Sequence, residues 1–213
     1  MNILIIGSGG REHAFSQKIK ESPLCDKLFV APGNAGTATI ATNVSIPVDN
    51  FEKLGQLCIV EKIGLVIVGP EVPLVKGIRD YFESKAELKN ILMVGPGKTG
   101  AQLEGSKDFS KQFMLRNNVP TAKAKTFTSS KEASDFIKDL KPPYVLKADG
   151  LAAGKGVVIT SDLNEAVSVI KEMLDNKQFG EASSRILIEE FLDGIEVSVF
   201  ILTDGKDYVV LPA

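Results

Sequence analysis

Residues 2–13 read Asn-Ile-Leu-Ile-Ile-Gly-Ser-Gly-Gly-Arg-Glu-His, and they indicate the fold class of the chain. The consecutive apolar residues predict a strand covered on both faces, because a half-exposed strand would alternate apolar and polar positions. The glycines that follow are expected to turn the chain into a helix, whose first backbone N–H groups bind anions. We therefore expect an anion site at Gly9, Gly10 and Arg11, although the same residues are compatible with a plain tight turn.

This pattern recurs along the first hundred residues. Most of the apolar runs end at glycine and proline, helical periodicity separates them, and they lie at 28–31, 44–46, 65–68 and 91–94. Buried strands alternating with helices are typical of a parallel sheet with helices on both faces, and ligands of such sheets lie at the carboxyl ends of the strands. We expect residues 1–102 to form a doubly wound, Rossmann-like α/β domain.

The dinucleotide-binding fingerprint GxGxxG is not met by this domain. Its third glycine would stand at position 12, which is Glu12, and Pro32 and Gly33 stand where an acidic residue is expected. A nicotinamide-dependent dehydrogenase is therefore disfavoured. Glu71 follows a glycine turn at a strand end, where it would either accept hydrogen bonds from a sugar or favour the start of a helix.

The composition excludes several classes of protein. Acidic side chains number 27 and basic ones 25, so no basic field favours nucleic acid. The apolar runs are far shorter than the ~20 residues of a membrane span, and the two cysteines form neither a disulfide framework nor a zinc motif. We expect a cytoplasmic, monomeric protein without nucleic-acid or membrane partners.

The pattern changes after residue 102 to hairpin-linked strands and capped helices, which predicts an α+β unit. A helix is expected at 106–117, two more follow capping boxes at Ser129 and Asp162, and Asp204-Gly205 predicts a hairpin turn. The strands are expected at 124–127, 144–147, 157–160, 185–190 and 196–202. A single sheet running through both halves of the chain would contradict this division.

Two segments of the second half indicate a nucleotide. Residues 147–157, Lys-Ala-Asp-Gly-Leu-Ala-Ala-Gly-Lys-Gly-Val, predict a mobile cationic flap at 150–156 over a polyphosphate, because so many glycines destabilise a plain surface hairpin. The spacing is not that of a Walker A loop. Residues 187–196, Leu-Ile-Glu-Glu-Phe-Leu-Asp-Gly-Ile-Glu, offer an apolar slot for adenine and carboxylates for ribose, although an edge strand with an acidic face has the same pattern.

Together these motifs resemble one enzyme family. The segments GSGGREHA, APGNAGT, VGPEVPLVKGI, GPGKTGAQLEGSK, KADGLAAGKGV and IEEFLDGIEVS occur in this order and span essentially the whole chain. They are similar to the phosphoribosylamine–glycine ligases, also called glycinamide ribonucleotide synthetases, of the ATP-grasp superfamily. The resemblance implies a pre-ATP-grasp domain at 1–102 and the first part of an ATP-grasp domain at 103–213, with a lid subdomain at about 121–190.

The resemblance also implies a reaction. ATP would phosphorylate glycine, and the amine of 5-phosphoribosylamine would attack the acyl phosphate to give glycinamide ribonucleotide, ADP and phosphate. The implied ATP contacts are Lys107 and Lys147 to the phosphates, Gly154, Lys155 and Gly156 in the flap, Glu189, Glu190, Phe191 and Leu192 around adenine, and Glu196 on the ribose. Gly9, Gly10, Arg11 and Glu71 are expected to bind phosphoribosylamine.

In the family the chain continues well beyond this length. The resemblance therefore implies that the Mg²⁺ ligands lie beyond residue 213, and that this chain is an N-terminal fragment, inactive alone, with no catalytic residue or metal ligand of its own. Two alternatives stay open. One is another ATP-grasp carboxylate–amine ligase, and the other is a non-catalytic fragment that binds a nucleotide or a phosphosugar.

Overall fold

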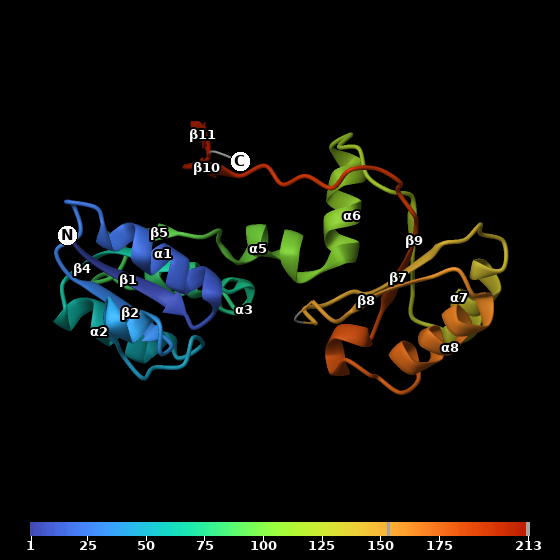
Figure 1. The fold of residues 1–213 in the computed structure, drawn as a ribbon, viewed down its shortest axis with the longest axis horizontal. Coiled ribbons are helices and arrows are strands. Elements are labelled where there is room, and N and C mark those ends of the chain that lie inside the picture. Colours follow the sequence, from blue (N-terminus) through green and yellow to red (C-terminus); the bar gives the residue numbers. More distant parts are fainter. Residues whose placement is uncertain (153, 212–213) are drawn as a thin grey trace.

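The computed structural model describes residues 1–152 and 154–211, which fold around separate sheets (Figure 1). The helices are α1 Gly10–Lys20, α2 Phe51–Val60, α3 Glu71–Val75, α4 Ile78–Glu83, α5 Lys98–Gly105, α6 Lys107–Arg116, α7 Ser130–Ile137 and α8 Leu163–Leu174, with 3-10 turns η1 Thr37–Thr39 and η2 Gly180–Ser183. The strands are β1 Asn2–Gly7, β2 Leu28–Pro32, β3 Thr42–Asn43, β4 Ile63–Val68, β5 Leu92–Val94, β6 Ala124–Phe127, β7 Tyr144–Ala148, β8 Val157–Thr160, β9 Ile186–Glu190, β10 Ile201–Thr203 and β11 Tyr208–Val210.

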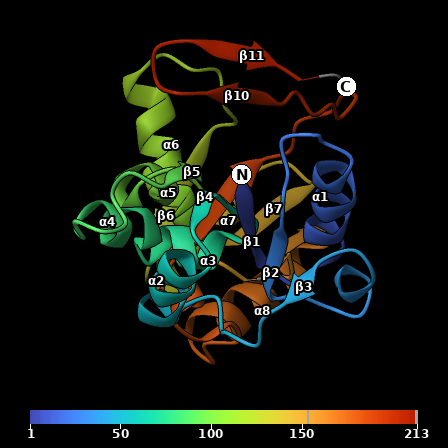
Figure 2. The ribbon, with the colours of Figure 1, turned by 90° about the vertical axis from the view of Figure 1, so that its left-hand side faces the viewer.

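The first sheet is parallel and has the strand order β3-β2-β1-β4-β5. Alternate residues of β1 are buried on opposite faces: Ile3 and Ile5 pack with Ile19 of α1, whereas Leu4 and Ile6 pack with Leu54 of α2. Figure 2 shows these two helices on opposite sides of the strands. The prediction of a doubly wound sheet with strands covered on both faces is therefore confirmed.

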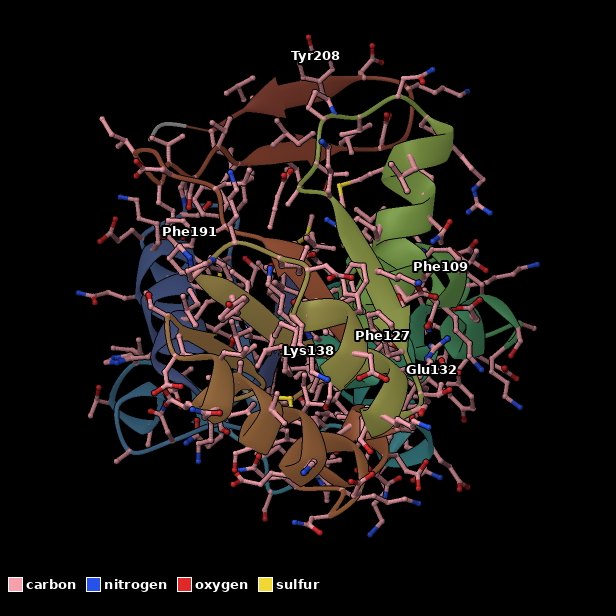
Figure 3. The ribbon with its side chains drawn as sticks, turned by 90° about the vertical axis from the view of Figure 1, so that its right-hand side faces the viewer. Phe109, Phe127, Glu132, Lys138, Phe191 and Tyr208 are labelled. Carbon is pink, nitrogen blue, oxygen red and sulfur yellow. The ribbon has the colours of Figure 1, made fainter. Side chains whose placement is uncertain are left out.

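The second sheet is antiparallel and has the order β6-β9-β7-β8. Helices α7 and α8 cover one of its faces, and Phe127 of β6, labelled in Figure 3, packs against Phe136 of α7 with ring centroids 5.1 Å apart. Both helices begin where the capping boxes predict. The Ser129 side chain accepts a hydrogen bond from the Glu132 N–H at the start of α7, and the Asp162 side chain accepts one from the Glu165 N–H at the start of α8. The predicted α+β character is confirmed.

Two predicted strands are placed differently by the structure. The short third strand lies at Thr42–Asn43 and not at 44–46, where Val44 and Ile46 instead pack their side chains against the core. The prediction of a strand over 196–202 is wrong for its first part, since β10 begins at Ile201 and residues 191–200 have no regular structure and are exposed. A strand needs a neighbouring backbone to pair with, and β10 finds it in β11, across the hairpin turn predicted at Asp204.

Helices α5 and α6 connect the two layers (Figure 1). α5 packs against α3 of the first layer. Ser106 separates α5 from α6 and caps α6, because its hydroxyl accepts a hydrogen bond from the Phe109 N–H. The predicted helix at 106–117 is thus confirmed. Among the described residues, no helix is both long and apolar enough to cross a bilayer.

Candidate functional site

A cavity of about 920 Å³ lies between α6 and the second sheet, and residues of α3 and α5 of the first layer also line it. Its volume is in the range of small-molecule sites. Charged side chains of α3, α5, α6, β7 and β9 line it. Apolar residues of the same three helices, of the flap, of β8 and of the segments before β6 and after β9 complete its wall. The lining includes Lys107, Lys111 and Met114 of α6, Lys147 of β7, Glu189 of β9, Leu192, and Gly150, Leu151, Ala152, Gly154 and Gly156 of the flap.

Three charged side chains form an ion network in the cavity wall. Glu189 accepts from the ammonium of Lys147 at 2.6 Å through one carboxylate oxygen and from that of Lys111 at 3.0 Å through the other. Burial of the Glu189 carboxyl acts to raise its pKa, but the hydrogen bonds and charges of the two lysines outweigh this and hold the pKa below its ordinary value. The carboxylate is therefore charged, and each of its oxygens contacts a different lysine.

Lys107 is tied to the start of the flap. Its backbone N–H donates to the Asp149 carbonyl at 3.1 Å, and its ammonium donates to the Gly150 carbonyl at 3.1 Å. Burial of the ammonium is the main cause of the lowered pKa of Lys107, and repulsion from Lys147 acts in the same direction. The charges of Asp149, Glu104 and Glu189 act in the opposite direction on this pKa. Lys107 and Lys147 thus bring two ammonium groups to one cavity wall, an arrangement that a bound anion could neutralise.

Asp149 joins α6, the flap and the second sheet. Its carboxylate accepts hydrogen bonds from the Ser106 hydroxyl at 3.0 Å, from the Asp108 N–H at 2.8 Å and from the Arg185 guanidinium at 2.6 Å. The side chain is buried, so these bonds replace its contacts with water. Asp149 thereby fixes the first turn of α6, which carries Lys107.

The flap is closed by backbone hydrogen bonds near both ends, from Gly150 N–H to the Ala182 carbonyl at 3.0 Å and from Ala148 N–H to the Gly156 carbonyl at 2.7 Å. Gly154 has φ +77°, a left-handed conformation that favours glycine. Ala153, which the predicted mobile segment includes, lies outside the described residues. The mobility of the flap stays a prediction.

Of the other residues expected to contact the nucleotide, some belong to the described lining of the cavity and others do not. Leu192 lines the cavity, as do Gly154 and Gly156 of the flap. Lys155, Glu190, Phe191 and Glu196 are exposed and stand outside the described lining. Glu190 instead accepts from the Lys123 N–H at 2.8 Å, and Figure 3 shows Phe191 at the end of β9, on the other side of the view from Phe109 of α6.

A second pocket of about 560 Å³ lies at the carboxyl ends of β1 and β4, where the sequence predicts a ligand. Arg11 and Glu71 both line it and meet there, because the Arg11 guanidinium contacts the Glu71 carboxylate at 3.2 Å and donates to the Gly69 carbonyl at 2.5 Å. Both side chains are about half exposed, so the ion pair is accessible to a ligand.

The glycine loop between β1 and α1 is held by hydrogen bonds to neighbouring side chains. The buried Glu12 carboxylate accepts from the Gly9 N–H at 2.7 Å, and Asn34 donates its amide to the Ser8 carbonyl at 2.9 Å. The Gly9 donor is thus already engaged. Gly10 is the first residue of α1, and an added Cβ there would meet open space.

Some of the residues that build the site were not found by sequence reasoning. Lys111 follows Lys107 by one helical turn, a spacing that places both on one face of α6 and could have indicated it. Asp149 stands inside the flap motif, but no local pattern shows that it caps α6. Among the described residues, no group of three or more His, Cys, Asp and Glu side chains could hold a metal ion.

A Rossmann-like layer followed by an antiparallel sheet with a lysine-lined cavity under a glycine-rich flap is the architecture of the amino-terminal part of an ATP-grasp protein. Residues 1–104 match the family model described as phosphoribosylglycinamide synthetase, N domain. Residues 105–213 match the one described as phosphoribosylglycinamide synthetase, ATP-grasp (A) domain. The chain belongs to the phosphoribosylglycinamide synthetase family.

Relatives and solved structures agree with this assignment. The phosphoribosylamine–glycine ligase of Pasteurella multocida is 52% identical over 97% of this chain and 48% of its own length. The crystal structure of the Thermotoga maritima phosphoribosylamine–glycine ligase has a TM-score of 0.79 and 31% identity over all of this chain and 49% of its own. An ADP complex of an N5-carboxyaminoimidazole ribonucleotide synthetase, 20% identical over 99% of this chain and 52% of its own, shares the fold with a TM-score of 0.69. The chain spans about half the length of the curated relatives it matches.

Proposed function

We propose that this chain provides the nucleotide-binding part of an enzyme that joins glycine to 5-phosphoribosylamine. In this reaction the terminal phosphoryl group of ATP passes to the glycine carboxylate, and the phosphoribosylamine nitrogen then forms the amide as phosphate and a proton leave. The single observation that carries the proposal is the cavity in which Lys107, Lys147 and the flap converge. The family and its named relatives support it.

Lys107 and Lys147 are proposed to bind the phosphates of ATP. An ammonium group is a point charge that suits a phosphate oxygen, and both of these lysines line the cavity. The further proposed ATP contacts are Gly154, Lys155, Gly156, Glu189, Glu190, Phe191, Leu192 and Glu196. Leu192 supplies apolar surface of the kind that adenine needs, at the end of β9.

The second pocket is proposed to bind phosphoribosylamine. Arg11 would donate to its phosphate or hydroxyl groups, and Glu71 would accept from its hydroxyls or amine. Gly10 would offer the N–H of a helix start, whereas Gly9 would shape the loop, because its own N–H donates to Glu12. Mg²⁺ belongs to the proposed reaction as a counter-ion of the phosphates, with ligands outside the described residues.

We also propose two domains, 1–102 and 103–213, with a lid at about 121–190, in a monomer. Separate sheets support this division, although α5 (Lys98–Gly105) continues across the expected boundary. Limited proteolysis of the purified protein should yield two stable fragments. Cleavage within the sheets before any cleavage between them would contradict the proposal, and size-exclusion chromatography with light scattering tests the monomer.

The function is tested on the full-length protein with ATP and Mg²⁺. Phosphate release should require both glycine and phosphoribosylamine. If phosphate is released only when another carboxylate replaces glycine, or another amine replaces phosphoribosylamine, the protein is a different ligase of this fold. Lys147→Ala should weaken ATP binding by roughly ten- to a hundredfold, since a charge-assisted hydrogen bond contributes ~1.5–3 kcal/mol. The matched control is Lys141→Ala, an exposed lysine before β7, and it should bind ATP as the wild type does. Unchanged ATP binding by Lys147→Ala would overturn the proposed nucleotide site.

A further inference from the structure

The ion network in the cavity wall contains more positive charge than its own carboxylate needs. We infer that Lys111 is a positioning residue of the phosphate site: it neutralises Glu189, so that Lys147 is held in place while its charge stays available to a ligand. This inference rests on the proposed function, because it concerns the same nucleotide cavity.

Lys111 has no hydrogen left for a ligand. A lysine ammonium has three donor hydrogens, and that of Lys111 donates to the Thr121 hydroxyl at 2.7 Å and the Ala122 carbonyl at 2.9 Å and contacts Glu189 at 3.0 Å. Its side chain is 7% exposed. Its effect on a bound anion must therefore come from its charge and from the groups that it holds.

Lys147, in contrast to Lys111, is partly exposed to the cavity. It contacts the second Glu189 oxygen at 2.6 Å, yet its side chain is 29% exposed and lines the cavity. One of its three hydrogens goes to the carboxylate, and the exposed side of the ammonium is open to a phosphate oxygen. The contact with Glu189 fixes where that ammonium lies.

The charge of the network explains why two lysines share one carboxylate. With both lysines the three groups sum to +1, and this charge remains for the ligand. Without Lys111, Glu189 would cancel Lys147 and the sum of this pair would be zero. Of the lysines in the described lining, Lys107 alone would then attract a phosphate, so the wall would attract it less. Stability alone is a poor reason for such a network, because apolar residues of similar volume often replace buried ion pairs at no cost.

The experiment compares a charged and an uncharged ligand of the same cavity. The full-length wild type, Lys111→Met and the double variant Lys111→Met/Glu189→Gln are titrated calorimetrically with ATP and with adenosine, and melting curves establish that each is folded. Lys171→Met, an exposed lysine of α8, controls for the loss of one positive charge at a distance. We expect Lys111→Met to bind ATP roughly ten- to a hundredfold more weakly and adenosine as the wild type does.

In the double variant the glutamine keeps the size of Glu189, a proposed ATP contact, and one hydrogen-bond acceptor. Because the negative charge is gone, the sum returns to +1, and most of the lost ATP affinity should be recovered. If Lys111→Met does not fold, the double variant carries the test alone, and its ATP affinity should lie within about tenfold of the wild type. Equal losses for ATP and adenosine, no loss for either, or a double variant no better than Lys111→Met would overturn the inference. A wild type that does not bind ATP would overturn the proposed function itself.

Discussion

Replacing Asp149 by alanine should destabilise the second half of the chain. The buried carboxylate accepts from the Ser106 hydroxyl, the Asp108 N–H and the Arg185 guanidinium. Alanine leaves these donors without their partner and removes an acceptor at the first turn of α6. The perturbation is therefore local, and the contacts that it removes are known.

The expected loss follows from the exposure of each donor. Truncating one partner of a fully buried ion pair costs about 3–5 kcal/mol, but the Arg185 side chain is 43% exposed, so water takes over part of its interaction. The bonds to Ser106 and to the Asp108 N–H contribute roughly 1 kcal/mol each. We expect a decrease of about 2–4 kcal/mol in the free energy of unfolding, and weaker ATP binding, because Lys107 begins the same helical turn.

Urea unfolding of the full-length protein, followed by far-UV circular dichroism, measures this loss. Asp139→Ala is the matched control, because it makes the same substitution at an exposed position in the same half of the chain. Its free energy of unfolding should lie within about 0.5 kcal/mol of that of the wild type. Asp149→Asn keeps an acceptor but loses the charge, and should fall between the two. If Asp149→Ala unfolds at the same urea concentration as the control, Asp149 does not hold the start of α6.

Three further predictions concern other parts of the molecule. The pKa of Glu189 is lowered in the folded protein, so the ionised carboxylate stabilises the fold at pH values above the pKa of the unfolded chain. This stabilisation is lost as the pH falls through the folded pKa. The urea midpoint of the wild type should therefore fall more steeply between about pH 6 and pH 3 than that of Glu189→Gln. Burial raises the pKa of Cys58 to about 12, so a thiol reagent should modify it in urea but not in the folded protein at neutral pH. Gly7→Ala should lower the free energy of unfolding by about 1–3 kcal/mol, because φ at Gly7 is +137° and an added Cβ would lie 2.5 Å from Glu12. Gly10→Ala should be neutral, because an added Cβ at Gly10 would meet open space. Equal melting temperatures for the two variants would contradict this prediction.

Much of the fold could be predicted because its signals are local. The run at 3–6 is apolar at every position, and the structure buries β1 on both faces. Ser129 and Asp162 cap α7 and α8 where the pattern places them. The strand expected over 196–202 was misplaced because pairing, unlike apolarity, depends on a neighbouring backbone. For β10 that neighbour is β11.

The candidate site was predicted in part. The glycine-rich motif indicated Lys147 and the flap, the family resemblance indicated Lys107, and the structure brings all three to one cavity. Arg11 and Glu71, 60 positions apart, were expected at the same sheet edge and do meet there. Glu196 was expected at the ribose, but it lies in the exposed segment after β9 and outside the described lining of the cavity.

The amino-acid sequence by itself determined the class of the fold, the ends of most elements and the family, because hydrophobic periodicity, capping and glycine turns act between residues close together in the chain. Tertiary structure alone decided which charges face one another. Asp149 meets Arg185 from 36 positions away and Ser106 from 43, and Lys111 of α6 reaches the carboxylate of Glu189 on β9. Coulomb energies and hydrogen bonds depend on distance in space, and packing of α6 on the second sheet sets those distances.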